Sequence, residues 1–510
     1  MVARKAKEIW EYGDFQTPAV LAEQVAELIQ QLGFRPKSIL EPTCGRGTFL
    51  LASAMAFPQA KALVGVEIQK EHLTYCRKQI TRANYNDKVR LLHEDFFTLN
   101  WESILNDLPE PLLIIGNPPW VTSSELGMLG SKNLPEKSNF QGRSGFDALT
   151  GKSNFDISEW MLLKHLEWMQ TREGMMAVLC KTSVARKVLI QVWKKHQKIA
   201  KAWIYKIDAK KHFGAAVDAC LFIVHSSIEQ NSPQYPVYKS FEAKNPIQII
   251  GYCDEILVAD VPLYKRWSHL RGTDSTHIWR SGLKHDCSKV MELKREGGKF
   301  RNGFGQKISL EDTYLFPLYK SSDIGNGHLR EARKNVIVTQ RTVGEDTQQI
   351  AQNAPRTWKY LQANKEMFEK RASVIYKNRP PFSIFGVGEY TFAPWKVAIS
   401  GFYKKLDFKV IEPIQGRTPM VDDTIYFLPC GTKEQAQFLV DLLNSAPARQ
   451  FLSSMIFWED KRPITVELLK RLNIKALAKE LGRDIELETI ENRQTSTSRK
   501  GFEQANLLAA

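Results

Sequence analysis

Short apolar runs alternate with longer amphipathic stretches between residues 17 and 225. The apolar runs have the length of buried strands, and they are Ser38–Leu40, Lys61–Ile68, Val89–His93, Leu112–Ile115, Met175–Leu179 and Ala219–Val224. The first amphipathic stretch begins at Thr17-Pro18, which suits a helix with a threonine N-cap and a proline in its first turn. Strands separated by helices predict βαβ units and a doubly wound sheet.

The alternation ends near a polar segment, Ser226–Pro236, which we interpret as a domain junction. Strands, Gly/Pro turns and aromatic residues then dominate to about residue 430, and a helix is expected over Lys433–Leu443. The predicted parts are an α/β domain over residues 1–230, a mixed α+β, strand-rich domain over 231–490 and a polar tail over 491–510. The polar stretch 122–153 is long for a loop, which indicates a functional or mobile segment.

Composition narrows the class of protein and its partners. The 510 residues carry a formal net charge of +15, which favours a polyanionic partner, nucleic acid before an anionic membrane surface. The seven cysteines are scattered without a CxxC pair, which argues against a disulfide framework or a structural zinc site. We expect no secretory signal, no membrane span and a bacterial-type cytoplasmic location.

A turn with acceptor groups follows the fourth predicted strand. Its residues are Asn117-Pro118-Pro119-Trp120, and the two prolines hold a rigid, extended turn. Open α/β sheets place ligands at this end of their strands. The Asn117 amide oxygen and the Pro118 carbonyl are two acceptors beside the Trp120 ring, which suits a planar group with an amino substituent. A strand-ending turn with a buried tryptophan is the structural alternative.

The three preceding predicted strands also end in residues that are suited to binding a ligand. Glu41–Phe49 is an acidic, glycine-rich corner, and Leu50 stands where a dinucleotide fingerprint has its third glycine, so a smaller nucleoside ligand is favoured. Glu67 suits ribose hydroxyls. Asp95-Phe96 suits an adenine amino group and ring. Each acid alone is equally a helix cap or a solvated side chain, but their order along one rim favours a site.

These motifs resemble the S-adenosylmethionine-dependent DNA adenine-N6 methyltransferases of the gamma motif order. That family begins with a Phe-x-Thr-Pro segment, here Phe15-Gln16-Thr17-Pro18. The resemblance covers residues 10–225 closely and the remainder only by architecture. Trp120 departs from the usual Tyr or Phe, and Asn117 favours adenine over the cytosine-N4 branch, which typically has Ser.

The resemblance implies a Rossmann-like class I methyltransferase sheet followed by a target-recognition domain. Its catalytic residues would be Asn117, Pro118, Pro119, Trp120 and the later aromatic Phe213. Its cofactor-binding residues would be Phe15, Thr17, Glu41, Pro42, Cys44, Gly45, Gly47, Glu67, Ile68, Asp95 and Phe96. The implied cofactor is S-adenosyl-L-methionine, with no metal.

The second half combines basic and aromatic residues, especially over 356–417, which suits DNA contacts. The alternative for that region is an aromatic core with solvated lysines. The segments His285-Asp286-Cys287 and Glu292-Leu293-Lys294 only weakly suggest a metal or nuclease site, and we expect neither.

The sequence therefore predicts a site-specific DNA adenine-N6 methyltransferase that acts on a flipped adenine in double-stranded DNA. It would be a monomeric modification enzyme of a restriction-modification or related defence system. A cognate restriction endonuclease, encoded separately, is a candidate partner. The alternatives are methylation of RNA or of a protein glutamine, and a methyltransferase-like subunit that mainly binds DNA.

Overall fold

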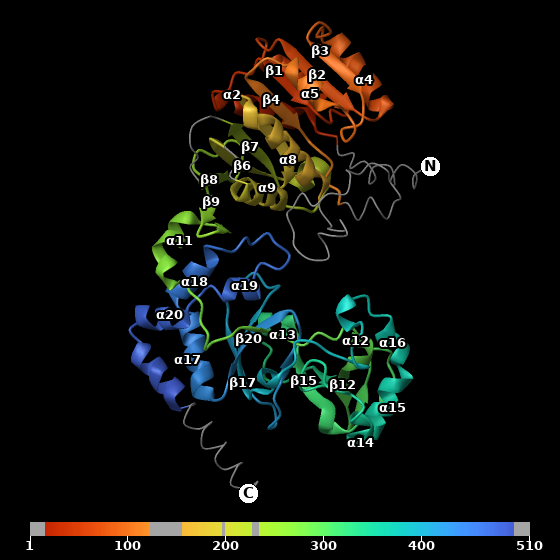
Figure 1. Ribbon diagram of the computed structural model, residues 1–510, viewed down its shortest axis with the longest axis vertical. Helices are drawn as coiled ribbons and strands as arrows, with labels where there is room; N and C mark the ends of the chain where they lie inside the picture. Colours follow the sequence, from red (N-terminus) through yellow and green to blue (C-terminus); the bar gives the residue numbers. More distant parts are fainter. Residues whose placement is uncertain (1–15, 123–155, 196–198, 227–233, 494–510) are drawn as a thin grey trace. The chain divides into compact units, whose positions relative to one another are not determined.

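The computed structural model describes residues 16–122, 156–195, 199–226 and 234–493. The chain forms two compact units, Met1–Val261 and Pro262–Ala510 (Figure 1). The loop predicted over 122–153 and the tail predicted over 491–510 lie almost wholly outside the described residues. Within those residues, no helix has the length and apolar character needed to cross a membrane.

The first unit is built on one mixed sheet, which has ten strands within the described residues. Its order is β10-β9-β8-β6-β7-β5-β4-β1-β2-β3, and β7 runs antiparallel to its neighbours β5 and β6. The strands are β1 (Ser38–Glu41), β2 (Ala62–Glu67), β3 (Val89–His93), β4 (Leu112–Gly116), β5 (Gly174–Lys181), β6 (Lys201–Ile207), β7 (Ala219–Ser226), β8 (Gln234–Tyr238), β9 (Gln248–Cys253) and β10 (Ile256–Val258).

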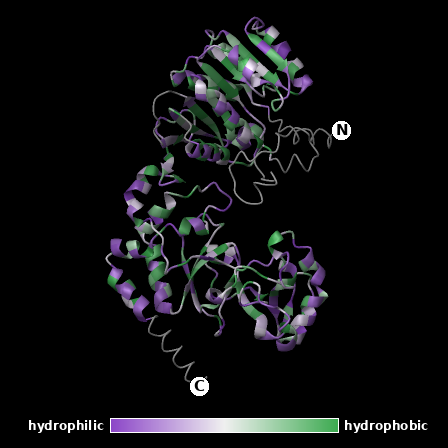
Figure 2. Ribbon diagram, viewed as in Figure 1, coloured by the Kyte–Doolittle hydropathy of each residue, from purple (hydrophilic) through white to green (hydrophobic). Residues whose placement is uncertain are grey.

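Helices cover both faces of the central strands, as a doubly wound sheet requires. They are α2 (Ala19–Gln31), α3 (Thr48–Ala56), α4 (Lys70–Arg82), α5 (Trp101–Asn106), α8 (Ile157–Trp168), α9 (Thr182–Lys194), α10 (Ala209–Phe213) and the 3-10 helix η1 (Met169–Thr171). Every residue of β4 is buried, and Leu113 and Ile115 share a core cluster with α2, α3 and α4. Figure 2 shows these central strands in the green of hydrophobic residues.

The structure differs from the predicted pattern at both ends of this unit. Helix α2 begins at Ala19 with Pro18 at the N-cap position, so Thr17 lies before the helix rather than capping it. The first unit ends at Val261 rather than near residue 230, because β8, β9 and β10 extend the same sheet. The change of composition after β7 therefore does not mark the end of the first unit.

The second unit contains two smaller sheets, of order β11-β20-β17-β18 and β14-β13-β12-β16-β15-β19. Their strands are β11 (Arg280–Ser281), β12 (Glu292–Glu296), β13 (Lys299–Arg301), β14 (Lys307–Ile308), β15 (Leu315–Tyr319), β16 (Lys334–Ile337), β17 (Trp395–Ser400), β18 (Lys409–Ile411), β19 (Met420–Val421) and β20 (Ile425–Cys430). The second unit is therefore a mixed α+β, strand-rich domain, as the sequence predicted.

Its helices are mostly short. They are α11 (Val261–Trp267, at the junction), α12 (Ser288–Met291), α13 (Ser321–Asn326), α14 (Ile350–Asn353), α15 (Pro355–Ala363), α16 (Lys365–Glu369), α17 (Lys433–Leu443), α18 (Ala446–Ser453), α19 (Val466–Leu469), α20 (Ile474–Glu480) and the 3-10 helices η2 (Ser268–Leu270), η3 (Asp312–Tyr314), η4 (Val374–Tyr376) and η5 (Glu389–Phe392). The bounds of α17 are those predicted.

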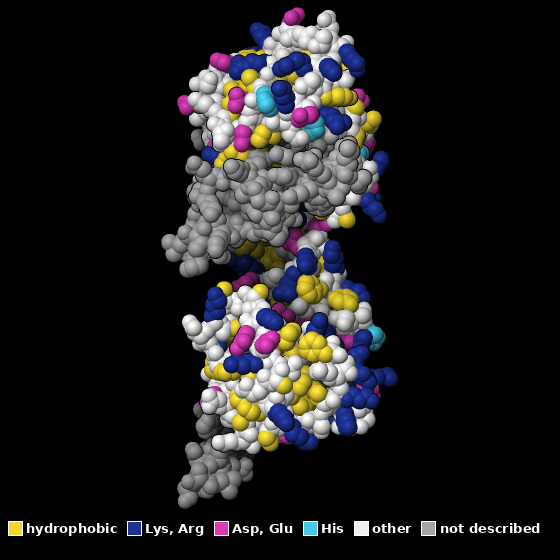
Figure 3. All heavy atoms as spheres, turned by 90° about the vertical axis from the view of Figure 1, so that its right-hand side faces the viewer, with side chains coloured by type: hydrophobic (Ala, Val, Ile, Leu, Met, Phe, Trp, Pro, Cys, Tyr) yellow, Lys and Arg dark blue, Asp and Glu magenta, His cyan; other side chains and the backbone are white. Residues whose placement is uncertain are grey.

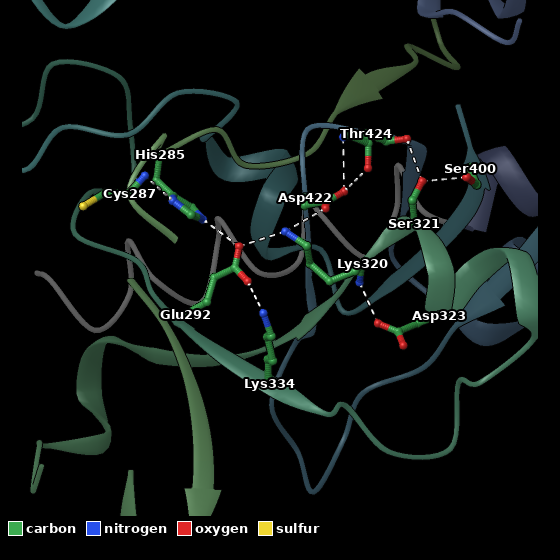
Figure 4. Close-up of polar contacts among 10 residues, drawn as sticks. All are labelled: His285, Cys287, Glu292, Lys320, Ser321, Asp323, Lys334, Ser400, Asp422 and Thr424. Atoms are coloured by element: carbon green, nitrogen blue, oxygen red, sulfur yellow. Dashed lines mark hydrogen bonds and ion pairs between the residues drawn. The ribbon is translucent and has the colours of Figure 1, made fainter. Parts of the chain in front are cut away.

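A buried ion cluster links strands of the two sheets (Figure 4). The Glu292 carboxylate on β12 accepts from Lys320 Nζ at 2.8 Å and from Lys334 Nζ at 2.6 Å. Lys320 also pairs with Asp422, between β19 and β20, at 2.9 Å. Burial raises the pKa of Glu292, but hydrogen bonds from His285, Lys320 and Lys334 together hold it well below its usual value. Glu292, which weakly suggested a nuclease, is thus the centre of an ion-pair network, and its neighbour Lys294 is exposed.

Candidate active site

A cavity opens in the first unit where β1, β2, β3 and β4 end. Its wall is made by the segments that follow these four strands, together with the chain before α2 and one residue of α8. The lining residues are Gln16, Thr17, Glu41, Pro42, Thr43, Cys44, Gly45, Thr48, Phe49, Val66, Glu67, Ile68, Gln69, His72, Glu94, Asp95, Phe96, Phe97, Asn117, Pro119 and Met161. The predicted convergence of successive strand ends is therefore real.

Carboxylates hold the glycine-rich corner in place. Glu67 Oε2 accepts from the Gly45 amide at 2.8 Å, and its Oε1 accepts from the Gln69 amide at 2.7 Å. Glu41 Oε2 accepts from the Leu50 amide at 3.1 Å, so this acid caps the first turn of α3. Burial raises the pKa of Glu41 well above its usual value, which favours the neutral form. Both acids therefore shape the corner as well as line the cavity.

The charge of the lining residues indicates which kind of ligand the cavity favours. The described lining contains four carboxyl groups, of which Glu41 favours its neutral form, and neither lysine nor arginine. The whole chain, in contrast, carries a net charge of +15. An anionic dinucleotide would be repelled by such a wall, whereas a ligand with cationic groups would be attracted. S-adenosylmethionine, with its sulfonium and amino groups, its ribose and its adenine, fits this donor set.

Aromatic rings stand at the adenine end predicted for this cavity. Asp95 Oδ1 accepts from the Phe97 amide at 2.8 Å, which fixes the turn after β3. Phe96 is buried, with Trp101 at 5.1 Å between ring centroids, whereas Phe97 is only partly buried. Both phenylalanine rings and Met161 of α8 line the cavity. Phe97, the second residue of a Phe-Phe pair, was not among the predicted site residues, and neither was Met161, for which the sequence carries no signal.

The Asn-Pro-Pro-Trp turn stands directly after β4, at the edge of the cavity. Asn117 and Pro119 line the cavity, while Trp120 is only 6% exposed and donates from Nε1 to the Leu179 carbonyl at 3.3 Å. The Trp120 ring meets Phe213 edge to face, with centroids 5.3 Å apart and planes at 72°. The structure thus brings Phe213, far away in sequence, to the turn.

Four of the predicted site residues do not line the cavity: Gly47, Pro118, Trp120 and Phe213. Gly47 has a left-handed backbone, with φ of 79°, and a Cβ there would lie 2.2 Å from Cys76 Sγ. This glycine is therefore required by the packing of α4 against the corner. Phe15 lies outside the described residues.

The sheet, with its reversed strand β7, and the cavity at its strand ends define a class I, S-adenosylmethionine-dependent methyltransferase. Residues 2–206 match the sequence model of the family described as N-6 DNA Methylase. Over 479 residues the chain is 43% identical to the type II methyltransferase M.NspV of Nostoc sp., an alignment that covers 94% of this chain and 99% of that one. The chain therefore belongs to the N-6 DNA methylase family.

Two further comparisons give a relative of part of the chain and a solved structure of similar fold. The chain is 36% identical over 110 residues to the modification methylase CviBIII of Paramecium bursaria Chlorella virus NC1A, covering 21% of this chain and 26% of that one. The solved structure of the type IIL restriction-modification enzyme MmeI in complex with DNA aligns with a TM-score of 0.53 at 13% identity. That alignment covers 88% of this chain and 64% of the MmeI chain, and it supports the fold across both units.

Proposed function

We propose that this chain is a site-specific DNA adenine-N6 methyltransferase. It would transfer a methyl group to an adenine that is flipped out of double-stranded DNA. The observation that carries the proposal is the position of the Asn-Pro-Pro-Trp turn: Asn117 and Pro119 line the acid-walled cavity that fits S-adenosylmethionine. Asn117, one of the two proposed acceptors, therefore lines this cavity, and Pro118, which carries the other, is the next residue of the same turn.

The proposed chemistry follows from the acceptors. The adenine amino group is a poor nucleophile because its lone pair is conjugated with the ring. Asn117 Oδ1 and the Pro118 carbonyl accept hydrogen bonds from its two N–H bonds, which localises the lone pair on the nitrogen and directs it toward the methyl donor. S-adenosylmethionine, when bound, supplies an electrophilic methyl group. Preorganised acceptors and positioning then account for the rate without a strong base.

The cofactor would be held by the residues of the corner and its neighbours. Glu67 would accept from the ribose hydroxyls, Asp95 from the adenine amino group, and Phe96 or Phe97 would contact the adenine ring. Thr17 and Glu41, which also line the cavity, would contact the methionine portion. The roles of Thr17, Glu41, Glu67, Asp95 and Phe96 are those that the family resemblance implies, and all five residues line the cavity.

The target base must leave the duplex before it reaches the acceptor turn, at a cost of a few kcal/mol. Trp120 and Phe213 are the aromatic residues that would contact it there. The second unit would supply the DNA recognition. Its surface carries many Lys and Arg side chains on the face drawn in Figure 3, as phosphate contacts require.

The proposed setting is a restriction-modification or related defence system, in a bacterial-type cytoplasm. The type II methyltransferase name of the Nostoc relative, which aligns over nearly its full length, supports this setting. A separately encoded restriction endonuclease is the corresponding partner. A monomer is sufficient, because an asymmetric DNA site needs no two-fold symmetry in the protein.

Base-modification-sensitive long-read sequencing tests the proposal. The chain and its Asn117→Ala variant would each be expressed in a bacterial host that lacks DNA methylation. We expect modified adenine in one short motif with the wild type and a loss of on the order of 10²- to 10³-fold in transfer rate with Asn117→Ala. Asn86→Ala, at an exposed asparagine of the same unit, is the control and should methylate normally. Soluble wild-type protein that modifies no DNA would direct the search to RNA and protein substrates.

A further inference from the structure

Lys181 is the last residue of β5, and its ammonium group lies beside the Asn-Pro-Pro-Trp turn. The register pairs Gly116 of β4 with Val178 of β5, so Lys181 stands three residues beyond that pair, level with the turn. Its Nζ donates to the Trp120 carbonyl at 2.9 Å and to Asp156 Oδ2 at 2.7 Å. The Lys181 side chain is 23% exposed and that of Asp156 is 6% exposed. Charge-assisted hydrogen bonds are strong in such a partly dry setting.

The partner acid is itself held firmly. Asp156 Oδ1 accepts from the Ser158 amide at 3.1 Å and from the Ser158 hydroxyl at 2.5 Å, which caps α8. The Ile157 amide donates to the Val121 carbonyl at 2.9 Å, and Thr122 and Asp156 form a β-bridge. The start of α8 is thus paired with the segment that follows the turn, and Lys181 binds both.

The turn needs such an outside donor because of its own composition. Pro118 and Pro119 have no N–H groups, so neither can anchor the turn by donating a hydrogen bond. Trp120 is held instead by the end of β5: its Nε1 donates to the Leu179 carbonyl, and its carbonyl accepts from Lys181. Leu179 and Lys181 of β5 therefore fix Trp120, the first through its side chain and the second through its main chain.

We propose that Lys181 is a positioning residue for methyl transfer, which holds the acceptors of Asn117 and Pro118 in the reactive geometry. This inference rests on the proposed function. A displacement of about 1 Å at a reacting centre costs on the order of 100-fold in rate. Lys181 is not in the lining of the cofactor cavity, so its removal should leave cofactor affinity unchanged.

Single-turnover kinetics on duplex DNA with saturating S-adenosylmethionine provide the first test. Lys181→Met should lower the rate of methyl transfer by about 10- to 100-fold, while the Kd for the cofactor changes by less than about twofold. Lys181→Arg, which keeps a cationic donor, should give an intermediate rate. Lys187→Met is the matched control, because Lys187 also pairs with an acid of α8, Glu159 Oε2, at 3.2 Å but does not contact the turn.

Hydrogen exchange without DNA separates this inference from the proposed function. The amides of residues 120–122 should exchange faster in Lys181→Met than in the wild type, and Lys187→Met should match the wild type. Unchanged exchange in Lys181→Met, or a transfer rate within twofold of the wild type, would overturn the positioning role. If the wild type methylates no DNA while exchange changes as expected, the positioning of the turn stands and the proposed substrate is wrong.

Discussion

Trp120 and Phe213 lie in direct contact, edge to face, with ring centroids 5.3 Å apart and planes at 72°. Two rings in contact at this angle leave no gap in which a base can be sandwiched. Trp120 belongs to the hydrophobic core, whereas Phe213 is only partly buried at the end of the short helix α10. Phe213 is therefore the ring with room to move when an extruded base reaches the turn.

We expect Phe213→Leu to lower kcat/KM for DNA by about tenfold, since an aromatic contact contributes roughly 0.5–1.5 kcal/mol beyond its buried area. The melting temperature should change little, because the replacement keeps an apolar side chain at a partly buried site. Phe241→Leu is the matched control: Phe241 packs, partly buried, against the same core, and contacts Tyr205 at 6.1 Å between centroids. Equal kinetics for the two variants would remove Phe213 from the base-binding site.

Gly47 provides a prediction about stability. Its left-handed backbone strains any side chain by about 1–2 kcal/mol, and the contact with Cys76 Sγ adds overpacking of about 1–3 kcal/mol. Gly33→Ala isolates the first effect, because Gly33 has φ of 82° and a Cβ there would have nothing within 4 Å. In urea unfolding, Gly47→Ala should therefore destabilise more than Gly33→Ala. A double-mutant cycle with Cys76→Ala should show a favourable coupling energy, and its absence would contradict the packing argument.

The central strands of the first unit could be predicted because a short apolar sequence is enough to indicate a buried strand. The strands β1, β2, β3, β4, β5 and β7 are apolar runs bounded by turns, and each lies where the pattern predicted it. The sequence pattern did not predict strand β6, because Lys201–Ile207 is not a continuous apolar run. It has an exposed lysine at its start and a partly exposed lysine near its end. The strands β8 and β9 follow a polar segment and extend the sheet through long-range pairing, which the local sequence does not encode.

The candidate site was predictable to the same extent. Residues of the glycine-rich corner and the proline turn carry their chemistry in short motifs, and most of them line one cavity. Lys181 carries no motif, since it is a single lysine at the end of an apolar strand. Its role depends on the register between β4 and β5 and on the start of α8, both of which are tertiary features. Met161 was missed for the same reason.

Lys396 in the second unit makes stability depend on pH. The side chain is fully buried on β17, and its Nζ donates to the Ala393 carbonyl at 2.8 Å. Burial lowers the pKa of Lys396 to about 7, although Cys430 acts in the opposite direction. In the unfolded chain the pKa is about 10.4. Between pH 7 and 10 the unfolded state therefore binds more protons, and stability rises with pH through this window.

Lys396→Met removes this cost and should raise the free energy of unfolding of the second unit at pH 7. The pKa difference between the unfolded and folded states corresponds to about 4–5 kcal/mol. The loss of the hydrogen bond to the Ala393 carbonyl reduces this gain by about 1–3 kcal/mol. The gain should shrink as the pH approaches 10, where the lysine of the unfolded chain also becomes neutral. Urea unfolding at pH 7 and pH 9.5 checks this, and a gain that is independent of pH would show that the lysine is not the titrating group.

A basic pocket of the second unit is the most specific DNA-contact candidate in the region predicted from sequence. It has a volume of about 330 Å³ and an apolar floor that includes Phe368 and Phe382. Phe382 has φ of 59°, a conformation that is costly for a bulky residue and is often found at functional sites. Lys377 and Arg379 line this pocket and are exposed, and among the described residues neither forms an ion pair.

The double variant Lys377→Gln/Arg379→Gln should weaken binding to cognate and non-cognate duplexes alike, because phosphate contacts carry no sequence information. The slope of log K against log salt concentration should become shallower by about 0.9 for each phosphate that is no longer bound, hence by about 2 if both cations bind phosphates. Lys433→Gln/Arg493→Gln removes the same charge from residues already paired with Glu412 and Glu434, and should leave the slope nearly unchanged.

Fluorescence anisotropy between 50 and 200 mM salt, about the range over which such contacts lose their strength, measures both slopes. Equal slopes for the two double variants would place the DNA elsewhere on the second unit.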